Sequence, residues 1–251
     1  MTLEEMRHHL MAGVIERIAR SPERDAFVLR GGMLTRAWVA PIARPTRDLD
    51  FVGDFAFDRD ATTRRFATAL ELDLADDVKI DRASLAASPM WVDSGFPGVR
   101  VTLALGLGTV DQKLAIDVGF NDPLVPAAVT FAFPGSTGRV ELRAVRPETQ
   151  LAWKLHALAE MTTSWRPKDL HDLWLITGHV ALDAHELPPA IRAAFESRGF
   201  TRAQALGVLD APHWATKTSR LRWERTLPLE RVVAEVRARL AKPLADLPEW
   251  T

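Results

Sequence analysis

The chain has 251 residues, with 32 Lys and Arg against 33 Asp and Glu, so its formal net charge of -1 creates no overall field that attracts nucleic acid. It contains no cysteine, which excludes thiolate catalysis, iron–sulfur clusters, disulfides and cysteine-rich zinc sites. We expect no signal peptide and no membrane span, because the first residues include acidic ones and no stretch stays apolar for the about 18 residues that a membrane helix needs. These features predict a soluble, cytoplasmic protein.

The first part of the chain predicts helices alternating with strands. Apolar residues at four-residue spacing indicate helices, and short apolar or alternating runs indicate strands. The expected helices are residues 3–19, 33–39 and 58–73. The expected strands are residues 27–29, 48–52, 99–105 and 113–120, with a turn containing Gly106 and Gly108 between the last two.

From Pro147 onward the apolar spacing becomes helical, and several segments have proline near their start. The expected helices are residues 147–161, 167–176, 184–198, 202–209 and 229–240. The predicted fold class is therefore α+β. We expect two domains, residues 1–146 with a mixed sheet and residues 147–251 with helices that pack against it.

Two carboxylates separated by one residue are the most informative feature of the first part. Side chains alternate between faces in a strand, so Asp48 and Asp50 would project from one face about 6.6 Å apart. Such a pair suits two magnesium ions, which lie about 3.5 to 4 Å apart in enzymes that transfer phosphoryl or nucleotidyl groups. Two exposed carboxylates on an edge strand are the structural alternative. Upstream, Gly31 and Gly32 offer backbone amides that can approach a phosphate at a helix start.

Asp117 is a third acidic candidate, because it is the only charge in the apolar run from Leu114 to Val118. An unpaired charge in a protein interior costs several kcal/mol, and coordination of a metal would compensate for that cost. The alternative is that Asp117 lies on a solvent-facing surface of its strand.

The helical part offers further charged residues. Lys154 is the basic residue of the helix expected at 147–161 that could meet a triphosphate as a point charge. Asp169 and Asp172 are three residues apart on the next helix, where surface ion pairs are the structural alternative. A basic segment with a tryptophan, residues 217–225, is a candidate nucleic-acid patch or a solvated helix face.

Taken in order, these segments resemble the motifs of the AbiEii-type nucleotidyltransferase toxins, which belong to the DNA polymerase β-like nucleotidyltransferase superfamily. The segments that carry the resemblance are Gly31-Gly32 and residues 44–51, 116–118, 154–158 and 166–173. The resemblance covers roughly residues 27–176 and implies a polymerase β-like core in the first domain.

Roles for individual residues follow from this resemblance. It implies that Asp48, Asp50 and Asp117 bind one or two Mg²⁺ ions and act in catalysis together with Lys154 and Asp169. It also implies a nucleotide-binding set, which comprises Gly31, Gly32, Thr46, Arg47, Lys154, Lys168 and Asp172. Thr46 stands where the family often has serine and keeps the hydroxyl. Arg47 either folds over the nucleotide or pairs with Asp48.

The function that follows is transfer of a nucleoside monophosphate from an NTP to an acceptor hydroxyl with the help of Mg²⁺. The resemblance implies the 3' end of tRNA as the acceptor and the role of toxin in a bacterial toxin–antitoxin system. The antitoxin would be a separate protein encoded in the same operon. The alternatives are nucleotidylation of a small molecule or a protein, and a nucleotide-binding module that transfers nothing.

Overall fold

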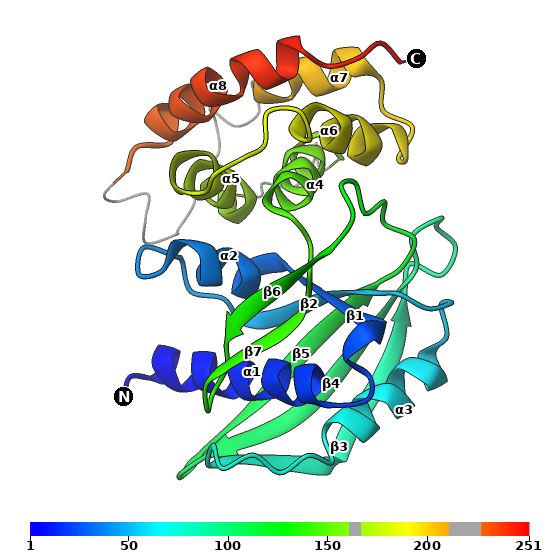
Figure 1. The fold of residues 1–251 in the computed structure, drawn as a ribbon, viewed down its shortest axis with the longest axis vertical. Helices are drawn as coiled ribbons and strands as arrows, with labels where there is room; N and C mark the ends of the chain where they lie inside the picture. Colours follow the sequence, from blue (N-terminus) through cyan, green and yellow to red (C-terminus); the bar gives the residue numbers. More distant parts are fainter. Residues whose placement is uncertain (161–166, 211–226, 251) are drawn as a thin grey trace. The chain divides into compact units, whose positions relative to one another are not determined.

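The computed structural model describes residues 1–160, 167–210 and 227–250, so the predicted basic patch at 217–225 lies outside the described residues. The chain divides into two compact units (Figure 1). The first comprises Met1–Asp122 and Ala128–Val145, and the second comprises Pro123–Ala127 and Arg146–Thr251. No helix in the described ranges is long and apolar enough to cross a membrane.

The first unit is built on one 7-stranded sheet with the strand order β3-β4-β5-β2-β1-β7-β6. Its strands are β1 Phe27–Arg30, β2 Asp48–Gly53, β3 Val78–Met90, β4 Gly98–Leu107, β5 Val110–Gly119, β6 Val129–Pro134 and β7 Arg139–Ala144. The sheet is mixed, because β2 pairs with β5 and β1 with β7 in parallel, while the other neighbours are antiparallel. The predicted mixed sheet is confirmed.

The two faces of this sheet differ because side chains alternate along each strand. One face of the central strands is apolar and buried, with Leu49 and Phe51 on β2 in register with Ile116 and Val118 on β5. Phe66 of α3 packs on this face against Phe51, with a ring-centroid distance of 6.4 Å. The acidic residues of β2 and β5 therefore project from the opposite face.

Along the chain, the helices of this unit lie before β1 and between the first three strands. They are α1 Leu3–Arg20, the short 3₁₀ helix Arg24–Ala26, α2 Gly31–Val39 and α3 Arg59–Ala69. A capping box starts α1, because the Thr2 hydroxyl accepts from the Glu5 amide while the Glu5 carboxylate accepts from the Thr2 amide. The expected start of α2 at residue 33 is wrong by two residues, since both glycines belong to its first turn.

The sequence-based expectations were wrong at three further points in this unit. The helix expected to reach residue 73 ends at Ala69, because the following residues turn toward α1, where Arg17 Nε donates to the Leu72 carbonyl at 3.0 Å. Gly106 lies within β4 opposite Asp111, and the turn to β5 is Gly108 and Thr109. Strands β3, β6 and β7 were not expected.

The missed strands lacked a clear period of two, with one exception. β3 and β6 are the edges of the sheet and bury few side chains, so neither shows an alternating apolar pattern. The exception is β7, where Val140, Leu142 and Ala144 alternate with polar residues and are buried. This alternation was present in the sequence and predicts a strand.

The second unit is helical. Its helices are α4 Pro147–Glu160, α5 Pro167–His179, α6 Leu187–Glu196, α7 Arg202–Gly207 with the 3₁₀ helix Val208–Asp210, and α8 Leu229–Ala245. They bury an apolar core to which α4 contributes Leu151 and Leu155, and α5 contributes Leu170 and Leu173. The segment Pro123–Ala127 joins this unit, since Thr149 Oγ1 donates to the Val125 carbonyl at 2.9 Å.

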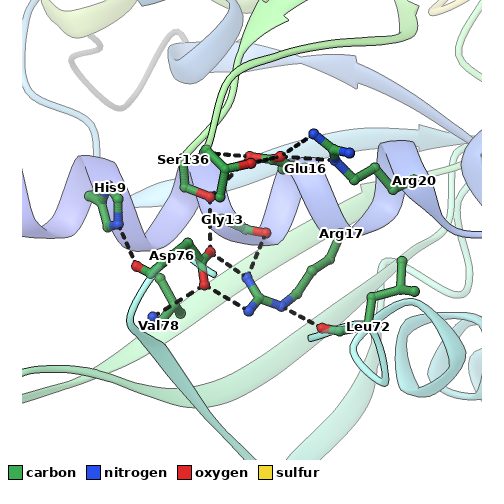
Figure 2. A network of polar contacts seen from close by, with 10 residues as sticks. His9, Gly13, Glu16, Arg17, Arg20, Leu72, Asp76, Val78 and Ser136 are labelled. Carbon is green, nitrogen blue, oxygen red and sulfur yellow. Dashed lines mark hydrogen bonds and ion pairs between the residues drawn. The ribbon is translucent and has the colours of Figure 1, made fainter. Parts of the chain in front are cut away.

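A buried ionic network holds α1 to the segment before β3 and to the turn between β6 and β7 (Figure 2). Arg17 donates two hydrogen bonds to Asp76, at 2.7 and 2.9 Å, and a third to the Gly13 carbonyl at 3.1 Å. The Ser136 hydroxyl, from the turn, lies 2.9 Å from Oδ2 of Asp76 and 3.0 Å from Oε2 of Glu16, and its one proton is shared between these two carboxylates. The Arg17 and Asp76 side chains are 1% and 0% exposed, so each depends on the other for compensation of its charge.

We expect Asp76→Ala to lower the free energy of unfolding by about 3 to 5 kcal/mol, because it leaves the Arg17 charge buried without its partner. The measurement is urea unfolding followed by circular dichroism. Asp73→Ala, an exposed aspartate in the same segment, is the control and should change stability by less than about 0.5 kcal/mol. Equal effects of the two substitutions would contradict the structural role of the network.

The same network makes stability depend on pH. Burial acts to raise the pKa of Asp76, but the bonds from Arg17 and Ser136 outweigh it and hold the pKa below its usual range. The native state therefore binds fewer protons than the unfolded state, and stability should decline as the pH falls below about 4. Unfolding measured from pH 7 to pH 3 should show this decline in the wild type and a shallower one in Asp76→Ala.

Candidate active site

The junction between β1 and α2 lies directly beside the acidic pair of β2. Gly31 has a φ of +77°, a conformation that residues with a Cβ rarely adopt. A Cβ added to Gly31 would lie 2.1 Å from Oδ2 of Asp50, and one added to Gly32 would lie 2.4 Å from Oγ1 of Thr46. Glycine at both positions thus lets the first turn of α2 approach the strand that carries the carboxylates.

Thr46 supports the first of these carboxylates. Its hydroxyl donates to Oδ1 of Asp48 at 3.2 Å, and Thr46 itself is buried. This hydrogen bond orients the Asp48 carboxylate through Oδ1, and Oδ2 does not take part in it. The hydroxyl that the family resemblance emphasised therefore positions an acidic side chain in this structure.

Strand register places the second and third carboxylates side by side. Asp50 of β2 is the partner of Asp117 on the parallel strand β5 and of Arg30 on the antiparallel strand β1. Asp117 is in turn the partner of Arg100 on β4. Four charged residues thus form one row across four adjacent strands, because directly paired residues project from the same face of a sheet. The alternative of an edge strand is wrong for Asp48 and Asp50, since β2 is central.

Arg100 is one of two residues in this row, together with Arg30, that the sequence-based prediction missed. Its Nε and Nη2 donate to Oδ1 and Oδ2 of Asp117 at 2.7 and 2.6 Å, and the two side chains are 48% and 15% exposed. The pKa of Arg100 is raised, and the largest cause is its hydrogen bonding to Asp117. The negative charges of Asp48 and Asp50 raise it further by smaller amounts. Asp117 is thus neither a lone buried charge nor freely solvated. A single arginine in the apolar run of β4 was the signal that the sequence contained.

The donor set of Asp48, Asp50 and Asp117 suits a magnesium ion by its chemistry, because Mg²⁺ prefers carboxylate oxygens. Their positions on one sheet face also agree with a shared ion. In the described parts of the chain, however, no group of three or more His, Cys, Asp or Glu side chains is placed to hold a metal. The three aspartates are residues of a type that binds Mg²⁺. In this structure, however, Arg100 contacts both carboxylate oxygens of Asp117.

Arg47 directly precedes Asp48 in the chain. It is exposed and lines a small hollow with Arg7, Met11 and Gln112, beside α1. Among the described residues no ion pair joins Arg47 to Asp48, so the pairing that the sequence suggested is absent there. Its role in nucleotide binding stays a prediction.

The second unit contains its own charged cluster. Lys154 Nζ of α4 lies 2.9 Å from Oδ1 of Asp169 and 2.8 Å from Oδ2 of Asp172, both on α5. The two aspartates are 3% and 1% exposed, so the alternative of surface ion pairs is wrong. Lys168, in contrast, is exposed at the start of α5.

Comparison with known proteins identifies the family. The family described as nucleotidyl transferase AbiEii toxin, type IV TA system, matches residues 14–246. The chain belongs to the AbiEii nucleotidyltransferase toxin family. No curated protein sequence matches it.

Solved structures show the same fold. The crystal structure described as a putative nucleotidyltransferase from H. pylori is 15% identical, with a TM-score of 0.58, and the match covers 98% of this chain and 97% of that one. JHP933 from Helicobacter pylori is 15% identical with a TM-score of 0.59, covering 98% and 94%. The nucleotidyltransferase toxin MenT4 from Mycobacterium tuberculosis H37Rv is 17% identical with a TM-score of 0.58, covering 98% and 84%.

The predicted fold class, α+β with a polymerase β-like nucleotidyltransferase core, is therefore confirmed. As a member of the AbiEii family, the protein is a nucleotidyltransferase toxin of type IV toxin–antitoxin systems. Family membership implies an NTP substrate and an antitoxin partner. The roles of individual site residues remain predictions from the motifs and the geometry.

The close approach at Gly31 makes a testable prediction for this AbiEii toxin. Gly31→Ala should cost about 1 kcal/mol for the backbone conformation, plus about 1 to 3 kcal/mol for the collision with Asp50. Gly108→Ala is a matched control, because Gly108 also has a positive φ, +60°, but has no atom within 4 Å of an added Cβ. The difference between the two in urea unfolding measures the contact with Asp50, and equal costs would contradict it.

Proposed function

We propose that this protein uses Mg²⁺ to transfer a nucleoside monophosphate from an NTP to a hydroxyl at the 3' end of tRNA. The observation that carries the proposal is the acidic row, in which strand register puts Asp117 beside Asp50, on the face that also carries Asp48. Aspartates that share one face of two neighbouring strands, next to a glycine-rich helix start, have the chemistry that a metal–triphosphate complex needs.

The reaction we propose is an in-line displacement. The acceptor oxygen attacks the α-phosphorus, the bond from that phosphorus to the oxygen bridging to the β-phosphate breaks, and pyrophosphate leaves with the electron pair. The hydroxyl proton passes to solvent. Mg²⁺ held by Asp48, Asp50 and Asp117 would supply charge neutralisation and a lowered pKa for the attacking hydroxyl.

The protein's own groups would position the phosphates. The first turn of α2 begins at Gly31, and a helix start offers backbone amides with a partial positive charge. Thr46 would keep Asp48 oriented through the hydroxyl bond already present. Most of the rate would come from this positioning and from neutralisation of phosphate charge, since phosphoryl-type transfer needs little covalent help.

Lys154 and Asp169 enter the proposal through the family motifs. Asp169 and Asp172 hold the Lys154 ammonium between them, which restricts its direction far more than an exposed lysine would be restricted. We propose that Lys154 neutralises triphosphate charge and that Asp169 positions it. Arg47, Lys168 and Asp172 complete the proposed nucleotide-binding set.

Substitution of Asp48 tests the proposal most directly. Asp48→Asn keeps the size of the side chain but removes a negative charge, so we expect kcat to fall by about 10³-fold or more while the protein stays folded. Asp111→Asn is the matched control. Asp111 is an exposed aspartate on β5, six residues before Asp117, so the alternation of side chains puts both on the same face of the strand. It should leave turnover unchanged.

The assay combines the purified protein, MgCl₂, total tRNA and each α-³²P-labelled NTP in turn, and separates labelled RNA, protein and small molecules. Label on tRNA that Asp48→Asn loses supports the proposal and names the nucleotide. Label on a protein or on a small molecule would show that this molecule, and not tRNA, is the acceptor. NTP binding without label anywhere would favour a module that binds nucleotide and transfers nothing.

A further inference from the structure

We propose that Arg100 is a displaceable counter-ion of the acidic row, which leaves Asp117 when a divalent ion binds and then binds a phosphate of the nucleotide. This inference rests on the proposed function, because it assigns a role at the same site. It concerns a residue outside the motifs that suggested the site.

The first argument is that Arg100 and a divalent ion would compete for the same atoms. Both oxygens of Asp117 accept from the Arg100 guanidinium, at 2.7 and 2.6 Å. A carboxylate with both oxygens in such a fork has its best directions for ligation occupied. For Asp117 to act as a metal ligand, Arg100 must release at least one of these bonds.

The second argument is that Arg100 is held weakly compared with a structural arginine of the same unit. Arg17 is 1% exposed and donates to Asp76 and to the carbonyls of Gly13 and Leu72. Arg100 is 48% exposed and, among the residues that the structure describes, donates its side-chain hydrogen bonds to Asp117. Because the Arg100 guanidinium is already half exposed, water can solvate it as soon as it leaves Asp117, whereas release of Arg17 would leave a charge buried without a partner.

The third argument concerns charge. Asp48, Asp50 and Asp117 carry three negative charges on one face of the sheet, and Arg100 is attracted by all three. Without a metal, this arginine reduces the repulsion among the carboxylates. A bound divalent ion would reduce this repulsion in place of Arg100. The guanidinium could then leave Asp117 and bind a phosphate, whose oxygens match its paired N–H donors.

This arrangement couples the two ligands. The ion alone must displace Arg100 and so binds less tightly than the three carboxylates would allow. The ion together with a nucleotide gives the displaced guanidinium a new anionic partner. Arg100 would therefore disfavour the metal-only state and favour the complete metal–nucleotide complex, which is positive cooperativity between ligands.

The test is a titration of the NTP-free protein with Mn²⁺ alone, followed by electron paramagnetic resonance of the free ion. Arg100→Gln should bind Mn²⁺ about five- to tenfold more tightly than the wild type, because the competing charge is gone. Arg100→Lys, which keeps the charge without the fork, should lie between the two. Arg82→Gln removes an exposed arginine from β3 and should match the wild type.

A second titration measures the nucleotide. With Mg²⁺ saturating, each α-labelled NTP should bind Arg100→Gln about tenfold more weakly than the wild type, the opposite direction to the Mn²⁺ effect. A general disturbance of the site would weaken both ligands. The proposal is overturned if Arg100→Gln binds Mn²⁺ no more tightly than the wild type, binds none measurably, or keeps full NTP affinity.

Asp48→Asn separates this inference from the proposed function. If Asp48→Asn loses Mn²⁺ binding while Arg100→Gln has unchanged affinity, the metal site stands and only the role of Arg100 is wrong. If Asp48→Asn binds Mn²⁺ as the wild type does, Asp48 is not a metal ligand, and the proposed function fails with the inference.

Discussion

The parallel pairing of β2 with β5 is the constraint on which the acidic site depends. It sets Asp50 beside Asp117, and the buried apolar residues on the other face, Phe51 and Val118, keep that register. A slip of one residue would turn these apolar side chains toward the acidic face and the carboxylates into the core. It would therefore expose apolar surface and bury unpaired charges, both of which destabilise the fold. The hydrophobic core thus specifies the geometry of the charged row.

Two arginine–aspartate pairs in the same unit illustrate how context decides what an ion pair does. Arg17 and Asp76 are fully buried and bonded to their neighbours, so they join α1 to the rest of the unit. Arg100 and Asp117 have similarly short bonds, but Arg100 is half exposed and the pair lies among further carboxylates. Burial makes the first pair a structural element, and exposure makes the second available for exchange with ligands.

The second unit shows the same principle for Lys154. Two aspartates one helical turn apart on α5 enclose its ammonium in a buried cluster. Taken alone, the spacing of Asp169 and Asp172 indicated only that they share a helix face. Burial of this cluster comes from the packing of α4 and α5 in the folded unit, where Leu155, Leu170 and Leu173 are buried as well.

The sequence by itself determined the α+β class, the main helices, the central strands and the family, because periodicity and motif order are local properties. It also indicated Asp48 and Asp50 as a pair, since alternation along one strand needs no partner. Only the tertiary structure decided that Arg100 faces Asp117, that Asp169 and Asp172 are buried, and that β3 and β6 close the sheet. These features depend on register and packing between distant segments, which no single stretch of sequence encodes.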